Sequence, residues 1–77
     1  MNHENRVLII DAGNTSIKAV RFVHGELMST SRFDKNHLDK LQDWYRAFDP
    51  EQVVVSSVLS KNDTDILLQL FANPILI

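Results

Sequence analysis

The segment Asp11-Ala12-Gly13-Asn14-Thr15 directly follows the apolar run Val7-Leu8-Ile9-Ile10, so a buried strand is expected to end in a small polar turn. A carboxylate on the last residue of a strand can hold a hydrated magnesium ion beside the oxygens of a polyphosphate. We therefore interpret this junction as a candidate nucleotide site, with Asp11 as its catalytic and metal-facing carboxylate.

Each residue of the turn has a possible role in binding phosphate. Gly13 is expected to take a positive φ and to let the backbone approach an anion closely. Asn14 and Thr15 supply short polar side chains and free backbone N–H groups, the components of an anion-binding nest. Lys18 shares a face with residues 14 and 16 in an extended segment, so its ammonium is expected to point towards the bound phosphate.

The same residues also fit a hairpin loop without any ligand. Gly and Asn are common in such loops for conformational reasons alone, and short motifs often match by chance. The residues around the turn must therefore decide between the two interpretations.

Three antiparallel strands are expected to hold the turn. Residues rich in branched and aromatic side chains predict strands from Arg6 to Ile10, from Ile17 to Phe22 and from Leu27 to Phe33. The candidate site joins the first two strands, and His24-Gly25-Glu26 predicts the tight reversal before the third.

An amphipathic helix should follow, because large apolar residues recur at helical spacing: Leu38, Leu41, Trp44, Tyr45 and Phe48. Asn36 or Asp34 is available as its N-cap, and Asp49-Pro50 as its end. We interpret the aromatic stripe as core packing against a sheet rather than as a platform for a ligand.

The remaining residues predict a strand, a helix and a final strand. Gln52 to Ser56 has the continuous apolar pattern of a central strand covered on both faces and paired in parallel with the first strand. Ser60-Lys61-Asn62-Asp63 resembles a capping box and opens a helix that ends at Asn73-Pro74. This helix is expected to bury Ile66, Leu67, Leu70 and Phe71, and an apolar strand begins after Pro74.

Two motifs resemble a known family. Asp11 to Thr15, followed by Lys18, is similar to the first phosphate motif of the sugar kinase, heat-shock protein and actin superfamily. Val53-Val54-Val55-Ser56-Ser57-Val58 resembles the strand and Ser-Ser-Val segment of type III pantothenate kinases, also called Bvg accessory factor proteins. The resemblance covers all 77 residues but matches only the N-terminal part of that family.

The resemblance implies an α/β fold of the ribonuclease-H-like type. Three antiparallel strands followed by helix, strand, helix and strand would form a mixed five-stranded half-domain. Residues 1–77 would then be the ATP phosphate-binding subdomain of a longer two-domain chain. Ligands of such sheets gather at the carboxyl ends of the parallel strands, where Asp11 and Ser56-Ser57 meet if their strands are neighbours.

The function implied by the resemblance is transfer of the ATP γ-phosphoryl group to pantothenate, the first step of coenzyme A synthesis. It implies ATP and Mg²⁺ as cofactors, adds a monovalent cation such as K⁺ as a candidate, and implies a homodimer when full length. The general base, the adenosine pocket and the pantothenate site would lie in a later domain, so residues 1–77 alone are expected not to turn over.

Other functions remain open. One alternative is a non-enzymatic member of the superfamily, either a regulatory protein or an actin-like assembly protein. Another is a kinase of the same superfamily that acts on a sugar, against which the Ser-Ser-Val strand argues weakly.

Composition narrows the partners and the compartment. The formal net charge is −2 and the 8 Lys and Arg residues are scattered, which argues against nucleic acid as a partner. No apolar stretch approaches the roughly 20 residues of a membrane span, and Met1 to Arg6 is polar and unlike a signal peptide. The expected location is therefore the cytoplasm.

Overall fold

A computed structural model of the chain describes residues 5–77. Residues 1–4, on which part of the signal-peptide argument rests, lie outside the described residues. In chain order the elements are β1 (Arg6–Ala12), β2 (Ile17–Val23), β3 (Glu26–Phe33), α1 (Leu38–Phe48), β4 (Gln52–Ser57), α2 (Lys61–Leu68) and β5 (Ile75–Leu76). Neither helix is long and apolar enough to cross a membrane.

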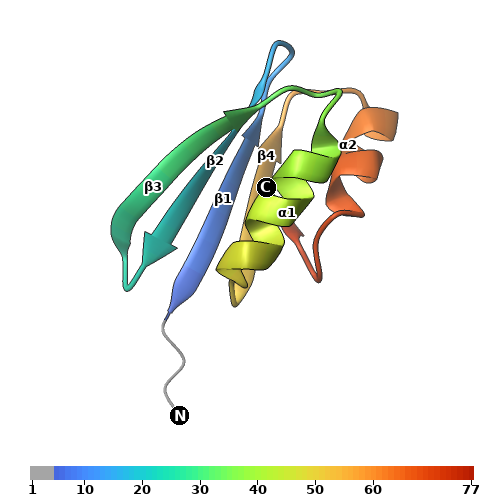
Figure 1. Cartoon of the computed structure of the whole chain (residues 1–77). Coiled ribbons are helices and arrows are strands. Elements are labelled where there is room, and N and C mark those ends of the chain that lie inside the picture. Colours follow the sequence, from blue (N-terminus) through green and yellow to red (C-terminus); the bar gives the residue numbers. More distant parts are fainter. Residues whose placement is uncertain (1–4) are drawn as a thin grey trace.

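The strands form one mixed sheet in the order β3-β2-β1-β4-β5 (Figure 1). β1 pairs antiparallel with β2 and β2 antiparallel with β3, whereas β1 with β4 and β4 with β5 are parallel. The predicted element order, the five-stranded mixed sheet and the neighbouring positions of the first and fourth strands are therefore confirmed.

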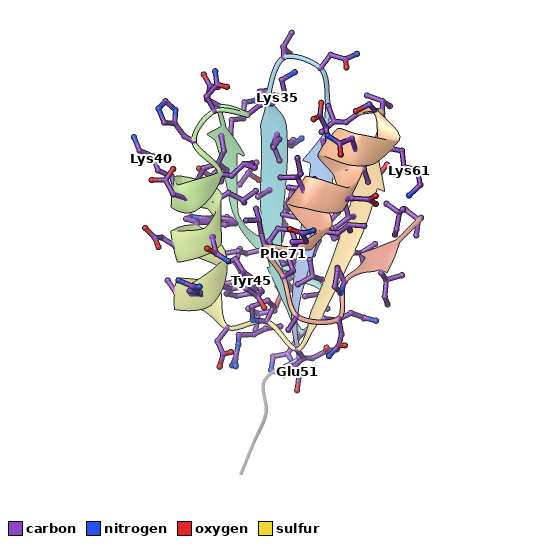
Figure 2. The ribbon with its side chains drawn as sticks, turned by 90° about the vertical axis from the view of Figure 1, so that its right-hand side faces the viewer. Lys35, Lys40, Tyr45, Glu51, Lys61 and Phe71 are labelled. Carbon is purple, nitrogen blue, oxygen red and sulfur yellow. The ribbon has the colours of Figure 1, made fainter. Side chains whose placement is uncertain are left out.

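Both helices lie on the same face of the sheet, in front of it in Figure 2. The reason is that β3-α1-β4 and β4-α2-β5 both connect parallel strands and both advance in the same direction across the sheet. Right-handed crossovers that advance in one direction place their helices on one side. The core lies under them: Leu8, Ile10, Ala12, Ile17, Ala19, Leu41, Val53, Val55, Leu67 and Phe71.

The prediction that the fourth strand is covered on both faces is therefore wrong. Val53 and Val55 of β4 are buried under the helices, but Val54 between them is only half-buried. A helix covers only one face of β4 within residues 5–77. We call the other side of the sheet the open face.

The aromatic stripe of α1 packs into the core, as predicted. Leu41 is completely buried. The ring of Trp44 meets Phe33 edge-on at 5.7 Å, and Tyr45 meets Phe71 edge-on at 4.9 Å. Figure 2 shows Tyr45 and Phe71 between the two helices. These contacts join α1 to the edge strand β3 and to the turn after α2.

Arg21 of β2 packs against two aromatic residues of α1. Its guanidinium lies 3.8 Å from the centre of the Trp44 ring and 5.1 Å from that of Phe48, and it donates a hydrogen bond of 2.9 Å to the Trp44 carbonyl. Desolvation by the surrounding side chains lowers the pKa of Arg21. Arg21 therefore acts as a packing residue, because its guanidinium stacks on aromatic rings.

The ends of the helices differ in part from the sequence prediction. α1 begins after His37, whose side chain makes no cap, while Asp34 accepts a hydrogen bond from the Asn36 N–H and forms a turn ahead of the helix. The prediction of Asn36 or Asp34 as N-cap is therefore wrong, because this local Asx turn takes the carboxylate away from the helix. Asp49 ends α1 in the left-handed conformation, as expected at the predicted end.

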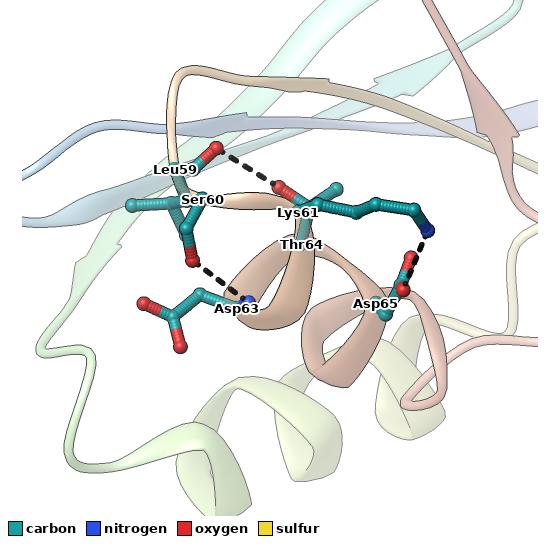
Figure 3. A network of polar contacts seen from close by, with 6 residues as sticks. All are labelled: Leu59, Ser60, Lys61, Asp63, Thr64 and Asp65. Atoms are coloured by element: carbon teal, nitrogen blue, oxygen red, sulfur yellow. Dashed lines mark hydrogen bonds and ion pairs between the residues drawn. The ribbon is translucent and has the colours of Figure 1, made fainter.

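The start of α2 is the predicted one, but its end is not. Ser60 accepts a hydrogen bond from the Asp63 N–H at 3.1 Å, as Figure 3 shows. α2 ends at Leu68, and a turn follows before β5 instead of continued helix to residue 73. Leu67 is buried as predicted, whereas the predicted burial of Ile66 is wrong, because its side chain lines an open pocket and is 45% exposed.

We predict that Leu41→Ala lowers the free energy of unfolding by about 2–5 kcal/mol, because it leaves a cavity under α1. Leu27→Ala is the matched control, since Leu27 is 61% exposed, and should change stability by less than about 0.5 kcal/mol. Urea unfolding followed by the fluorescence of Trp44 measures both. Equal effects of the two substitutions would contradict the one-sided core.

Candidate functional site

The predicted turn is a tight hairpin between β1 and β2. The Gly13 N–H donates a hydrogen bond of 3.0 Å to the Ser16 carbonyl, and Asn14 and Thr15 are exposed at the tip. Within the described residues, no backbone hydrogen bond occupies the N–H groups of Asn14 and Thr15. Two of the expected free donors are therefore present at the tip of the turn.

Gly13 has a different role from the expected one. Its φ is not positive, so the prediction of a left-handed glycine is wrong. A Cβ at this position would lie 3.3 Å from the Ser16 carbonyl oxygen, closer than most such contacts. Gly13 thus favours the close approach of its backbone to Ser16, to whose carbonyl it also donates the closing hydrogen bond.

A row of polar side chains crosses the open face beside the turn. In the sheet register Arg32 of β3 lies opposite Lys18 of β2, Lys18 opposite Asp11 of β1, and Asp11 beside Ser56 of β4. Register partners point to the same face. Since Leu8, Ile10 and Ala12 face the helices, Asp11 and its partners face the other way. We call these four residues the charged row.

The charges of the row have no ion-pair partner within residues 5–77. The ion pairs in this part of the chain are Arg6 with Asp49 and Lys61 with Asp65. Asp11 is exposed and Lys18 half-buried, so a carboxylate and an ammonium stand on adjacent strands without forming an ion pair in residues 5–77. This arrangement can receive an anion and a cation together.

Arg32 is a member of the row that the sequence prediction did not include. A two-residue loop, His24-Gly25, with both residues at positive φ, joins β2 to β3 and would by itself place Ser31 opposite Lys18. A β-bulge between Arg21 and Phe22 shifts the register by one residue and brings Arg32 there instead. The Arg32 guanidinium donates to the Ser16 hydroxyl at 3.3 Å, beside the turn.

Asp11 and the two serines of β4 lie at the same end of the sheet, as predicted from the parallel pairing. Ser57 is used structurally: its hydroxyl is 2.8 Å from that of Thr64 and accepts from the Leu59 N–H at 3.1 Å. Thr64 also reaches the Leu59 carbonyl at 3.5 Å (Figure 3). Ser57 therefore ties β4 to α2, and Ser56 is the serine that faces the charged row.

A pocket of about 290 Å³ lies on the other side of the sheet, between the segment before α1 and the start of α2. Its walls are mostly apolar, with polar groups from Lys35, Asn36 and Asp63. Ile17, the residue between Ser16 and Lys18, contributes to its floor. The pocket and the charged row are thus separated by the sheet itself.

Among the described residues, no three His, Cys, Asp or Glu side chains gather closely enough to hold a metal ion. A hydrated Mg²⁺ does not need three protein ligands, because it is usually held by one or two carboxylates together with phosphate oxygens and water. Asp11, which is exposed and has no ion pair in residues 5–77, fits this requirement.

We predict that Ser57→Ala lowers the free energy of unfolding by about 1–3 kcal/mol, because the buried Thr64 hydroxyl loses its short hydrogen bond. Ser56→Ala is the control and should cost less than about 0.5 kcal/mol. Thermal or urea unfolding of both variants checks this. A larger effect of Ser56→Ala would show that the structural serine had been misassigned.

No protein-family model and no curated protein sequence matches this chain. Among solved structures it is similar to a protein of unknown function with an actin-like ATPase fold from Bacteroides thetaiotaomicron. The TM-score is 0.68 at 13% sequence identity, over 96% of this chain and 33% of that one. The chain thus spans about one third of that protein's length, and its mixed five-stranded sheet with two helices has the architecture of an actin-like ATPase half-domain.

Proposed function

We propose that this chain is the N-terminal, ATP phosphate-binding part of a type III pantothenate kinase. The complete enzyme transfers the γ-phosphoryl group of ATP to pantothenate. One observation carries the proposal: Asp11, the last residue but one of β1, lies directly opposite Lys18 and close to a tight turn with two free backbone N–H groups. The actin-like ATPase fold supports the coarser part of the proposal, a nucleotide-binding protein of a kinase-containing superfamily.

The residues of the turn bind and orient the phosphates in this proposal. The N–H groups of Asn14 and Thr15 point to the phosphate oxygens, and the Thr15 hydroxyl adds a donor. Gly13 keeps the hairpin tight enough for both. Lys18 offsets the charge of the γ-phosphoryl group, which matters most as that group leaves ATP.

Asp11 positions the magnesium ion, directly or through bound water. A magnesium ion held there would supply Lewis-acid neutralisation of the phosphate charge. The contribution of Asp11 is one negative charge at a fixed place, held by the pairing of β1 with both neighbours. Ser56 lies next to it on β4 and is a further hydroxyl on the same face.

The rest of the catalytic machinery is assigned to a following domain. That domain supplies the base that activates the pantothenate hydroxyl, the adenosine pocket and the pantothenate site. The proposal includes a cytoplasmic enzyme, a homodimer of the complete chain and a monovalent cation such as K⁺ as an additional cofactor. Residues 1–77 alone are expected to bind phosphate without turning over.

We predict that Asp11→Asn in the complete enzyme of this proposal lowers kcat by roughly 10²-fold or more, since the metal is no longer held in place. Asp43→Asn is the matched control, because Asp43 is exposed on α1 and remote from the charged row. The assay is ATP-dependent phosphorylation of pantothenate with magnesium, and circular dichroism checks that both variants fold. Unchanged kcat in Asp11→Asn would exclude the proposed role of this carboxylate.

The same assay on the unmodified protein tests the proposed function itself. Expression of the complete enzyme of this proposal should give pantothenate-dependent consumption of ATP. A folded product that binds ATP but phosphorylates a sugar instead would identify another kinase of the superfamily. A folded product that binds ATP and transfers no phosphoryl group would favour the regulatory or assembly function.

A further inference from the structure

Lys18 and Arg32 stand directly opposite each other on β2 and β3, on the open face. Like charges at directly opposed positions destabilise a sheet. Neither side chain forms an ion pair within the part of the chain that the structure describes, and of the two cations only Lys18 adjoins Asp11 in the register. The charged row therefore has an excess of positive charge at its β3 end, which an anion would neutralise.

The guanidinium of Arg32 lies beside the turn and retains free donors. Its Nη1 donates to the Ser16 hydroxyl at 3.3 Å, next to the residues that close the hairpin. Arginine has five N–H donors in a planar fork, so this bond leaves others for two oxygens of one phosphoryl group. The stem of Arg32 is positioned by β3 and its head by Ser16.

Opposed positions on antiparallel strands bring the Cβ atoms of Lys18 and Arg32 within about 5 Å of each other. Two flexible cations at this spacing can contact oxygens of neighbouring phosphoryl groups in one ligand. A single phosphate can bind both heads only if they converge on one group, whereas a polyphosphate lets each head contact its own phosphoryl group and brings more negative charge to the two cations. A polyphosphate is the better match for the pair.

We propose that Arg32 is a second cation of the phosphate site, and that Arg32 and Lys18 bind adjacent phosphoryl groups of a nucleoside diphosphate or triphosphate. The inference rests on the proposed function and says which two cations contact the polyphosphate of its nucleotide. It adds a binding residue from β3, the strand that the sequence analysis left outside the site.

The test is isothermal titration calorimetry of the 77-residue chain with inorganic phosphate, pyrophosphate and ATP, each with magnesium. The unmodified chain should bind pyrophosphate and ATP more tightly than phosphate. Arg32→Gln should weaken pyrophosphate binding roughly tenfold or more, since a charge-assisted hydrogen bond is lost. Arg32→Lys should recover part of the affinity. Arg46→Gln is the control, because it removes the same charge from an exposed arginine in the last turn of α1. This variant should bind pyrophosphate as tightly as the unmodified chain.

Two different results would overturn the inference, and they are distinguishable. If Arg32→Gln binds pyrophosphate as tightly as the unmodified chain, Arg32 is only a charge on an edge strand, where it discourages pairing with other chains. The proposed function then still stands on Asp11 and Lys18. If the unmodified chain is folded by circular dichroism and binds neither pyrophosphate nor ATP, the proposed function fails together with the inference.

Discussion

The alternation of side chains along β1 is the constraint on which the rest of the structure depends. Leu8, Ile10 and Ala12 are completely buried, so every second residue of this central strand must face the helices. Asp11 lies between two of them and is thereby fixed on the opposite face. A slip of one residue in the register would place the carboxylate in the core, where its desolvation would be prohibitive. The hydrophobic core thus specifies the position of the carboxylate without contacting it.

Much of this arrangement could be predicted because it is encoded locally. The apolar run before Asp11 predicts a strand, the spacing of Leu41 and Trp44 predicts a helix, and their order predicts parallel pairing of β1 with β4. The place of Arg32 could not be predicted in this way. It depends on a single extra residue in β3, and a bulge leaves no clear mark in the sequence of a strand whose eight residues are all exposed or half-buried.

Two errors of the sequence analysis have physical causes that involve more than one segment. The apolar run in β4 indicates a buried strand but not what covers each face, since this depends on the direction in which successive crossovers advance. The role of Gly13 depends on how close Ser16 comes, which only the closed hairpin determines. Composition likewise could not separate Ser56 from Ser57, whose difference arises from the position of Thr64 on α2.

The open face has a consequence for how the charges of the row act. The half-buried apolar residues Ile9, Val20 and Val54 occupy the same face as Asp11 and Lys18, and are register partners in neighbouring rows. Any protein segment or domain that packs on those apolar residues therefore also removes water from around the charges. Coulomb interactions strengthen several-fold when the effective dielectric constant falls from about 80 to about 20. Burial of the open face would therefore also strengthen the electrostatic binding of an anion to the charged row.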